Sequence, residues 1–276
     1  MLIVGERINS SRKRIRQAIE KRDSAFIQKE ARKQFDAGAT YIDVNAGTSV
    51  SREVEDLKWL VQTVQAAVDA PLCIDSPSHE AQAQALALHK GLPLVNSITA
   101  EKERAEAILP LVKKYNARVV GLTMGSGGMP ASKEERMEAA AQIVAMVKGA
   151  GICLENLYFD PAVSAVSADQ KAALDVAATV KELKTTYEEA HVICGLSNIS
   201  FGLPQRNVLN RTYLALLMAQ GLDAVIIDPT EKHMMATLLA AHVLLGKDDF
   251  CMDYIMAERE GRLPASEDHI PSGAEK

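Results

Sequence analysis

The amino-acid sequence predicts a (β/α)8 barrel, in which eight parallel strands close into a cylinder and helices cover its outside. Eight apolar runs rich in Val, Ile and Leu recur about every 20 to 40 residues, and segments with helical spacing of apolar residues separate them. The runs lack a strict polar–apolar alternation, which is typical of strands buried on both faces of a parallel sheet. A barrel of this kind takes roughly 250 residues, and the chain has 276.

The expected elements alternate between strand and helix. We expect strands at 2–6, 41–45, 72–75, 92–96, 118–123, 156–160, 191–196 and 224–228. Segments with helical periodicity lie at 51–69, 79–90, 101–115, 133–148, 170–189, 210–219 and 231–245. Two serines are suited to cap helix N-termini, and four glycines stand where helices should end: Ser51, Ser132, Gly38, Gly91, Gly149 and Gly221.

Composition and charge narrow the classes of function. A net charge of -5 and a pI near 5.8, without a clustered Lys/Arg run, argue against nucleic-acid binding. No apolar run is long enough to span a bilayer, and the N-terminus lacks the pattern of a signal peptide. The four cysteines form no Cys-x-x-Cys pair, so neither a zinc site nor a disulfide framework is indicated. We expect a cytoplasmic protein with one domain over residues 1–260 and a polar, flexible tail over 261–276.

Polar side chains stand at the ends of four expected strands. Strands three, four, six and seven end in Asp75, Asn96, Asp160 and Asn198, and a barrel brings such ends together at its C-terminal mouth. A carboxylate accepts two parallel hydrogen bonds, and an Asn side chain offers a donor and an acceptor. The set suits a ring with an aminopyrimidinone edge, such as a pterin. The alternative is that these residues cap helices or bridge loops, as Asp-Pro and Asn-Ser sequences often do.

A divalent metal is a second functional interpretation of the strand ends. Its candidate ligands are the acids Glu6, Asp43, Asp75 and Asp160. This interpretation carries less weight, because amides rather than further acids stand beside them and no His ends a strand. We therefore expect no bound metal.

Other chemistries find little support. No Lys ends a strand, which counts against a Schiff-base aldolase. The glycine-rich sequence 125–128 lacks the Walker lysine, and we expect it to form a flexible loop over the mouth. Apolar residues that are suited to cover a bound ring follow the same strand ends: Met124, Met129, Phe201 and Leu203.

Eight short sequences form a set that is far more specific than any one motif. They are Gly5-Glu-Arg-Ile-Asn9, Asp43-Val-Asn45, Ile74-Asp-Ser76, Val95-Asn-Ser97, Gly121-Leu-Thr-Met124, Tyr158-Phe-Asp-Pro161, Gly195-Leu-Ser-Asn198 and Asn210-Arg-Thr212. The set resembles the folate-binding barrels of corrinoid-dependent methyltransferases in the pterin-binding, dihydropteroate-synthase-like superfamily. That group includes methyltetrahydrofolate:corrinoid/iron–sulfur protein methyltransferase and the folate domain of cobalamin-dependent methionine synthase. The resemblance covers residues 1–258, taken in order.

The chain departs from dihydropteroate synthase itself at two places. The synthase has a basic Ser-Arg-Lys-type end on strand seven, where this chain has Ser197 and Asn198. Its first strand runs into an Asn-x-Thr-Pro-Asp-Ser-Phe-like loop, where this chain has Glu-Arg-Ile-Asn at 6–9. The resemblance therefore favours methyl transfer over condensation of a pterin.

The resemblance implies a reaction and a set of site residues. A methyl group would move between N5 of tetrahydrofolate and the cobalt of a corrinoid, as methyltetrahydrofolate with cob(I)alamin or as tetrahydrofolate with methylcobalamin. Asp75, Asn96 and Asp160 would hold the pterin ring. Asn198, the expected catalytic residue, would reach toward N5, where a donated hydrogen bond stabilises the leaving nitrogen. Further folate contacts are expected from Ser197, Met124, Gly195 and Arg206, with supporting roles for Glu6, Asn9, Asp43 and Asn45.

The resemblance also implies partners. No Asp-x-His-x-x-Gly corrinoid-binding sequence occurs, so we expect the corrinoid to arrive on a separate protein that docks over the mouth. A homodimer is implied as well. Two other functions stay open: a pterin-condensing enzyme, and a non-catalytic subunit that binds folate.

Overall fold

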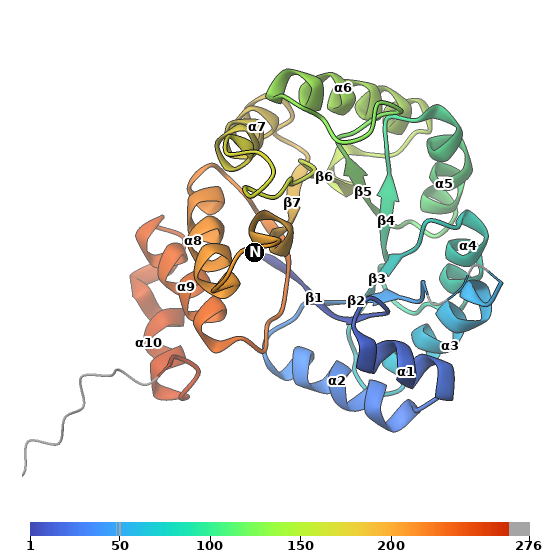
Figure 1. The fold of residues 1–276 in the computed structure, drawn as a ribbon, viewed down its shortest axis with the longest axis horizontal. Coiled ribbons are helices and arrows are strands. Elements are labelled where there is room, and N and C mark those ends of the chain that lie inside the picture. Colours follow the sequence, from blue (N-terminus) through green and yellow to red (C-terminus); the bar gives the residue numbers. More distant parts are fainter. Residues whose placement is uncertain (48, 50, 265–276) are drawn as a thin grey trace, which may run out of the picture.

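The computed structural model is a closed barrel of eight parallel strands, which confirms the predicted fold. It describes residues 1–47, 49 and 51–264, so most of the predicted tail lies outside the described residues. Figure 1 looks along the barrel, with the strands inside and the helices around them. The strands, in the order in which they pair, are β1 (Leu2–Asn9), β2 (Tyr41–Asn45), β3 (Leu72–Asp75), β4 (Leu94–Ile98), β5 (Arg118–Leu122), β6 (Leu157–Asp160), β7 (His191–Gly195) and β8 (Ala224–Ile227).

Helices connect consecutive strands and form the outer layer (Figure 1). They are α1 (Lys13–Lys21), α2 (Ser24–Asp36), α3 (Glu53–Gln65), α4 (His79–Leu88), α5 (Lys102–Lys114), α6 (Lys133–Gly149), α7 (Ala172–Thr186), α8 (Arg206–Ala219), α9 (Lys232–Leu244) and α10 (Met252–Arg259). Short 3-10 helices lie at η1 (Leu154–Asn156), η2 (Leu196–Ser200) and η3 (Asp249–Cys251). In the described part of the chain, no helix is both long and apolar enough to cross a membrane.

The expected helix ends are partly confirmed. Ser132 caps α6, because its hydroxyl accepts a backbone N–H of the first turn. The expected cap at Ser51 is wrong, since Arg52 precedes α3 and makes no side-chain cap. Gly149 is still inside α6, and Gly151, with a φ of 72°, makes the left-handed turn that follows it.

Side-chain alternation along the strands builds the inside of the barrel. One residue from each strand forms an apolar interior layer: Val4, Tyr41, Cys73, Leu94, Val120, Tyr158, Ile193 and Ala224. The residues that point outward pack against the helices in a second, larger core. Two positions further along, at the C-terminal mouth, the inward series is apolar in β5 and β8, with Leu122 and Ile226, and polar or small in the other six strands: Glu6, Asp43, Asp75, Asn96, Asp160 and Gly195. The mouth is therefore a polar ring on an apolar floor.

Candidate active site

A row of polar residues crosses the first four strands at the mouth. Parallel pairing places Asn9 beside Asn45, Asn45 beside Asp75, and Asp75 beside Asn96. Ser10 Oγ donates to Asn45 Oδ1 at 2.7 Å, and Asn45 Nδ2 donates to Asp75 Oδ2 at 3.0 Å. These two bonds orient the Asn45 amide and hold one oxygen of Asp75. The structure thus brings together four of the residues that the sequence predicted for the site.

The acids of this row have raised pKa values. Burial raises the pKa of Asp75, against the opposing effects of the Asn45 hydrogen bond and the Arg104 charge. Burial and the neighbouring Asp75 charge raise the pKa of Asp43 well above its ordinary value. Asp43 is 3% exposed, and its Oδ1 has no hydrogen-bond partner among the described residues. The surroundings of Asp43 therefore favour its neutral form more than water does, and the neutral form can donate as well as accept.

The side chains of Asp160 and Asn198 both lie close to Gly195. Burial raises the pKa of Asp160 to about 6, although the N–H groups of Ala162 and Gly195 oppose the shift. The Ala162 N–H donates to Asp160 Oδ1 at 2.9 Å. A Cβ placed on Gly195 would lie 3.9 Å from Asp160 Oδ2 and 3.9 Å from Asn198 Nδ2. The space that a Cβ would fill at position 195, here called the gap over Gly195, therefore lies within 4 Å of both an acceptor and a donor.

A second group of contacts joins β1 to the turn that carries Asn198. Ser197 Oγ donates to the two oxygens of Glu6 at 3.0 and 3.2 Å, and Arg12 pairs with Glu6 at 3.1 Å. Burial raises the pKa of Glu6, while Arg12 and Ser197 oppose the shift. Arg206 donates to the Ser197 carbonyl at 2.5 Å and to Ser200 Oγ at 3.0 Å. Arg206, predicted as a folate contact, thus holds η2.

Met124 lies at another part of the mouth. It lines a hollow of about 420 Å³ together with Ala100 and the glycine-rich loop 125–130. Thr123, the residue before it, donates its N–H to the Asp160 carbonyl at 2.8 Å, which places the start of this loop against the end of β6. Two apolar side chains that the sequence predicts at the mouth are exposed, Met129 by 54% and Phe201 by 68%.

Arg104 is a site residue that the sequence did not single out. From the first turn of α5 it donates to the Ser97 carbonyl at 2.8 Å, the Pro77 carbonyl at 2.9 Å and the Ser76 carbonyl at 3.3 Å. It therefore holds the ends of β3 and β4, which carry Asp75 and Asn96. Its sequence signal is a positive charge in the first turn of a helix, where the helix dipole disfavours it.

The structure offers no support for the metal interpretation within the residues it describes. In that part of the chain, no group of three or more His, Cys, Asp or Glu side chains is arranged to hold a metal ion. Glu6 and Asp75 also have protein partners of their own in Ser197, Arg12 and Asn45. That the reaction needs no metal stays a prediction.

The closed barrel and the polar residues at its mouth are those expected of a pterin-binding enzyme. A comparison with known sequences agrees with this class. Residues 5–228 match the family described as pterin binding enzyme. Because the match spans most of the chain, the protein belongs to that family.

Individual relatives narrow the comparison. The chain is 38% identical over 265 residues to methylcorrinoid:tetrahydrofolate methyltransferase of Eubacterium limosum, which covers 95% of this chain and 98% of that protein. It is 26% identical to the methionine synthases of Mycobacterium tuberculosis and Mycobacterium leprae over 84% of its own length. The matched region is 20% of each methionine synthase. These matches agree with the resemblance carried by the strand-end sequences.

Proposed function

We propose that this protein is a methyltransferase that moves a methyl group between N5 of tetrahydrofolate and the cobalt of a corrinoid. The observation that carries the proposal is the gap over Gly195, flanked by Asp160 Oδ2 and Asn198 Nδ2, in a member of the pterin-binding family. The name of the Eubacterium relative supports the direction from methylcorrinoid to tetrahydrofolate.

Asp160 is suited to hold the pterin edge. One of its oxygens is occupied by the Ala162 N–H, and the other faces the gap. Burial raises its pKa, and only backbone N–H groups oppose the shift. The ring N–H and amino group of an aminopyrimidinone would supply those donors in the parallel geometry that carboxylates accept. Asp75 and Asn96, side by side on β3 and β4, would hold the remaining polar atoms of the same ring.

Asn198 is suited to act at N5. When methyltetrahydrofolate donates its methyl group, negative charge develops on the departing nitrogen, and a hydrogen bond from Asn198 Nδ2 would stabilise it. In the opposite direction N5 gains the methyl group and loses its proton. The corrinoid supplies or accepts the methyl group, and the barrel contributes position and hydrogen bonds.

We propose that the corrinoid is carried by a separate protein that docks over the mouth. The chain lacks the Asp-x-His-x-x-Gly sequence that would bind a corrinoid itself. The exposed side chains of Met129 and Phe201 would give such a partner apolar contacts beside the polar ring.

An absorbance assay tests the proposal. The protein is mixed with methyltetrahydrofolate and cob(I)alamin, with free cobalamin standing in for the protein-bound corrinoid, and methylcobalamin is expected to form. The reverse mixture, tetrahydrofolate with methylcobalamin, should lose methylcobalamin. Tight folate binding without transfer in either mixture would instead identify a non-catalytic folate subunit. Formation of dihydropteroate from a pterin pyrophosphate and p-aminobenzoate would identify a condensing enzyme, which needs a basic group where β7 is followed by Ser197 and Asn198.

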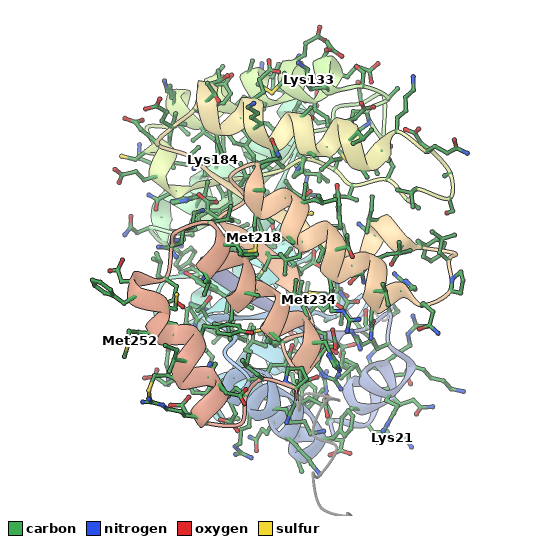
Figure 2. The ribbon with its side chains drawn as sticks, turned by 90° about the vertical axis from the view of Figure 1, so that its left-hand side faces the viewer. Lys21, Lys133, Lys184, Met218, Met234 and Met252 are labelled. Carbon is green, nitrogen blue, oxygen red and sulfur yellow. The ribbon has the colours of Figure 1, made fainter. Side chains whose placement is uncertain are left out.

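We propose that a second copy of the chain covers the outer face of α8, α9 and α10, here called the α8–α10 face. Figure 2 shows these helices side by side on one side of the barrel, with Met252 on α10. No Asp, Glu, Lys or Arg lies between Lys232 and Lys247, and a helix without charges on its outer side is usually covered. The exposed apolar side chains of the face are Leu216, Leu244, Phe250, Met252, Tyr254, Ile255 and Met256. Their number suits an interface of roughly 800 Å² per partner.

A second copy fits this face for two reasons. The face lies on the side of the barrel, so a partner that docks at the mouth does not cover it (Figure 1). A two-fold interface brings each patch against itself, which the uncharged stretch of α9 at the centre of the face tolerates. We expect Leu244→Glu, at a side chain that is 85% exposed, to convert a dimer into a monomer in light scattering. Leu174→Glu, on α7, is the control. A monomeric wild type, or a Leu244→Glu dimer, would contradict the proposal.

Domain extent and compartment complete the proposal. The family match ends at residue 228, and we propose that residues 1–260 form one domain because α9 and α10 continue the outer layer. All four cysteines are free, which is usual in a reducing compartment and supports the cytoplasm.

A further inference from the structure

Arg136 is a buried cation whose hydrogen bonds all go to backbone carbonyls. It is 2% exposed and lies in the first turn of α6. Its Nε donates to the Pro161 carbonyl at 2.7 Å, its Nη2 to the Ala162 carbonyl at 3.2 Å, and its Nη1 to the Ser132 carbonyl at 3.0 Å. Within the described residues Arg136 forms no ion pair, and the charge of Asp175 acts on it from a longer distance. A guanidinium buried without a carboxylate partner is unusual. The burial of Arg136 therefore suggests that its bonds to the backbone carbonyls have a role.

Two of the three carbonyls belong to the turn that follows Asp160. Ala162 has a φ of 53°, a left-handed conformation that is unfavourable for a residue with a Cβ. In this conformation the Ala162 N–H points back to Asp160 Oδ1. Such a conformation persists only where its surroundings hold it, and the fork of Arg136 holds the carbonyls on both sides of the Pro161–Ala162 bond.

We propose that Arg136 is a positioning residue for pterin binding: through the 161–162 turn it fixes Asp160 so that one oxygen is occupied by the backbone and the other faces the gap over Gly195. The inference rests on the proposed role of Asp160 in binding tetrahydrofolate. Arg136 itself does not touch the ligand. The proposed role of Arg136 depends on the planar shape of its guanidinium group, because only this shape lets one side chain donate to the carbonyls of Pro161, Ala162 and Ser132 at once.

The first experiment needs no ligand. Amide hydrogen exchange is measured for Ala162 in the wild type, in Arg136→Lys and in Arg118→Lys. Lysine keeps the charge but not the fork, so Ala162 should lose protection in Arg136→Lys. Arg118 lies at the start of β5 and donates to Tyr41 Oη at 3.1 Å, at the other end of the barrel. Arg118→Lys should leave Ala162 protected. Unchanged protection in Arg136→Lys overturns the proposal.

The second experiment is a double-mutant cycle on tetrahydrofolate affinity, measured by calorimetry. Arg136→Lys should weaken binding about tenfold in the wild type and less than about twofold in Asp160→Asn, because residues that act as one unit are not additive. Equal factors in the two backgrounds overturn the proposal and leave Arg136 as a residue that stabilises the fold. A wild type that binds no tetrahydrofolate overturns the proposed function instead, and hydrogen exchange at Ala162 then still decides whether Arg136 holds the turn.

Discussion

Two buried acids at opposite ends of the barrel, Asp223 and Asp160, differ in their hydrogen-bond partners and in the direction of their pKa shifts. Asp223, just before β8, accepts hydrogen bonds from the Val192 N–H at 2.8 Å and from Lys184 Nζ at 3.0 Å, and it pairs with His191 Nδ1 at 3.0 Å. Burial alone would raise the pKa of Asp223, but these partners hold it below its ordinary value. Asp160, at the end of β6, lacks comparable side-chain partners among the described residues, and burial raises its pKa to about 6.

The difference in donors between Asp223 and Asp160 suggests that the first acid serves stability and the second serves function. An acid with a full set of donors stabilises the folded state when it is charged, whereas a buried acid with too few donors opposes folding when it is charged. The apolar layer between the two ends, from Val4 to Ala224, keeps them apart. Asp223 at the N-terminal end of the barrel therefore has a complete set of donors, as has Asp228 at the mouth, whereas Asp160 at the mouth lacks side-chain donors among the described residues.

The largest effects are expected when the negative charge of Asp160 or of Asp223 is removed. Asp160→Asn keeps an oxygen for the Ala162 N–H but loses the carboxylate, so tetrahydrofolate binding should weaken by roughly 10- to 150-fold. Asp223→Asn should leave binding unchanged and lower the free energy of unfolding by about 1–3 kcal/mol at pH 7. Calorimetry and urea unfolding measure the two quantities. Unchanged binding by a folded Asp160→Asn would exclude Asp160 from the pterin site.

The pH dependence of the free energy of unfolding distinguishes Asp160 from Asp223 further. The folded-state pKa of Asp160 is raised, so its charge lowers stability above about pH 6, and this penalty disappears as the pH falls below 3.8. Asp160→Asn should thus be more stable than the wild type by about 2 kcal/mol at pH 8, with no gain at pH 3.5. The folded-state pKa of Asp223 is lowered, so its contribution is present above the ordinary value and is lost as the pH falls through the folded-state pKa. The loss in Asp223→Asn should therefore shrink in acid.

Removal of Asn198 should affect the rate more than the binding. An interaction that strengthens as charge develops on N5 acts mainly in the transition state. Asn198→Ala should slow single-turnover methyl transfer to cob(I)alamin by more than about tenfold, with a smaller loss of folate affinity. If bound substrate reacts at its usual speed in this variant, Asn198 serves only in binding.

A smaller effect is expected when the gap over Gly195 is filled. Gly195 has a φ of -75°, so alanine is compatible with the backbone, and the new Cβ would make ordinary contacts at 3.9 Å. Gly195→Ala should fold normally and bind tetrahydrofolate about tenfold more weakly, because the Cβ occupies space between Asp160 and Asn198. Gly149→Ala, which meets nothing within 4 Å, is the control. Equal affinity of the two variants would show that the ring does not lie over Gly195.

No effect is expected from chelators. The acids at the mouth are bonded to amides, hydroxyls and arginines, and the reaction as proposed needs no metal ion bound by this chain. Single-turnover transfer should be the same before and after dialysis against EDTA. Loss of activity that one particular ion restores would revive the carboxylate–metal interpretation.

The sequence predicts the barrel and most of the mouth because both follow from local periodicity. β2 and β3 have the predicted bounds, and Asp75, Asn96 and Asp160 each lie two positions beyond an apolar interior residue. The start of β4 was wrong by two residues, since Pro93 has no N–H for the ladder and the strand begins at Leu94. Asn198 lies on η2 instead of a strand end, because the chain turns directly after Gly195.

The rest of the site depends on contacts between distant parts of the chain. Arg136 reaches a carbonyl 25 residues further along the chain, and Arg104 reaches one 28 residues before it. The only local signal of either arginine is a positive charge in the first turn of a helix, and it does not show which distant carbonyls the side chain reaches. The raised pKa of Asp160 could not be predicted from the sequence either, because it arises from burial in the folded barrel.

The most direct test is a titration of the Asp160 carboxyl group by carbon-13 NMR, with and without tetrahydrofolate. The resonance is assigned by its absence from Asp160→Asn. In the free protein the pKa should be about 6. Donors from a bound pterin edge favour the charged form, so the pKa should fall clearly when tetrahydrofolate binds. A pKa that stays the same or rises on binding would contradict the claim that the mouth keeps this acid unpaired for the ligand.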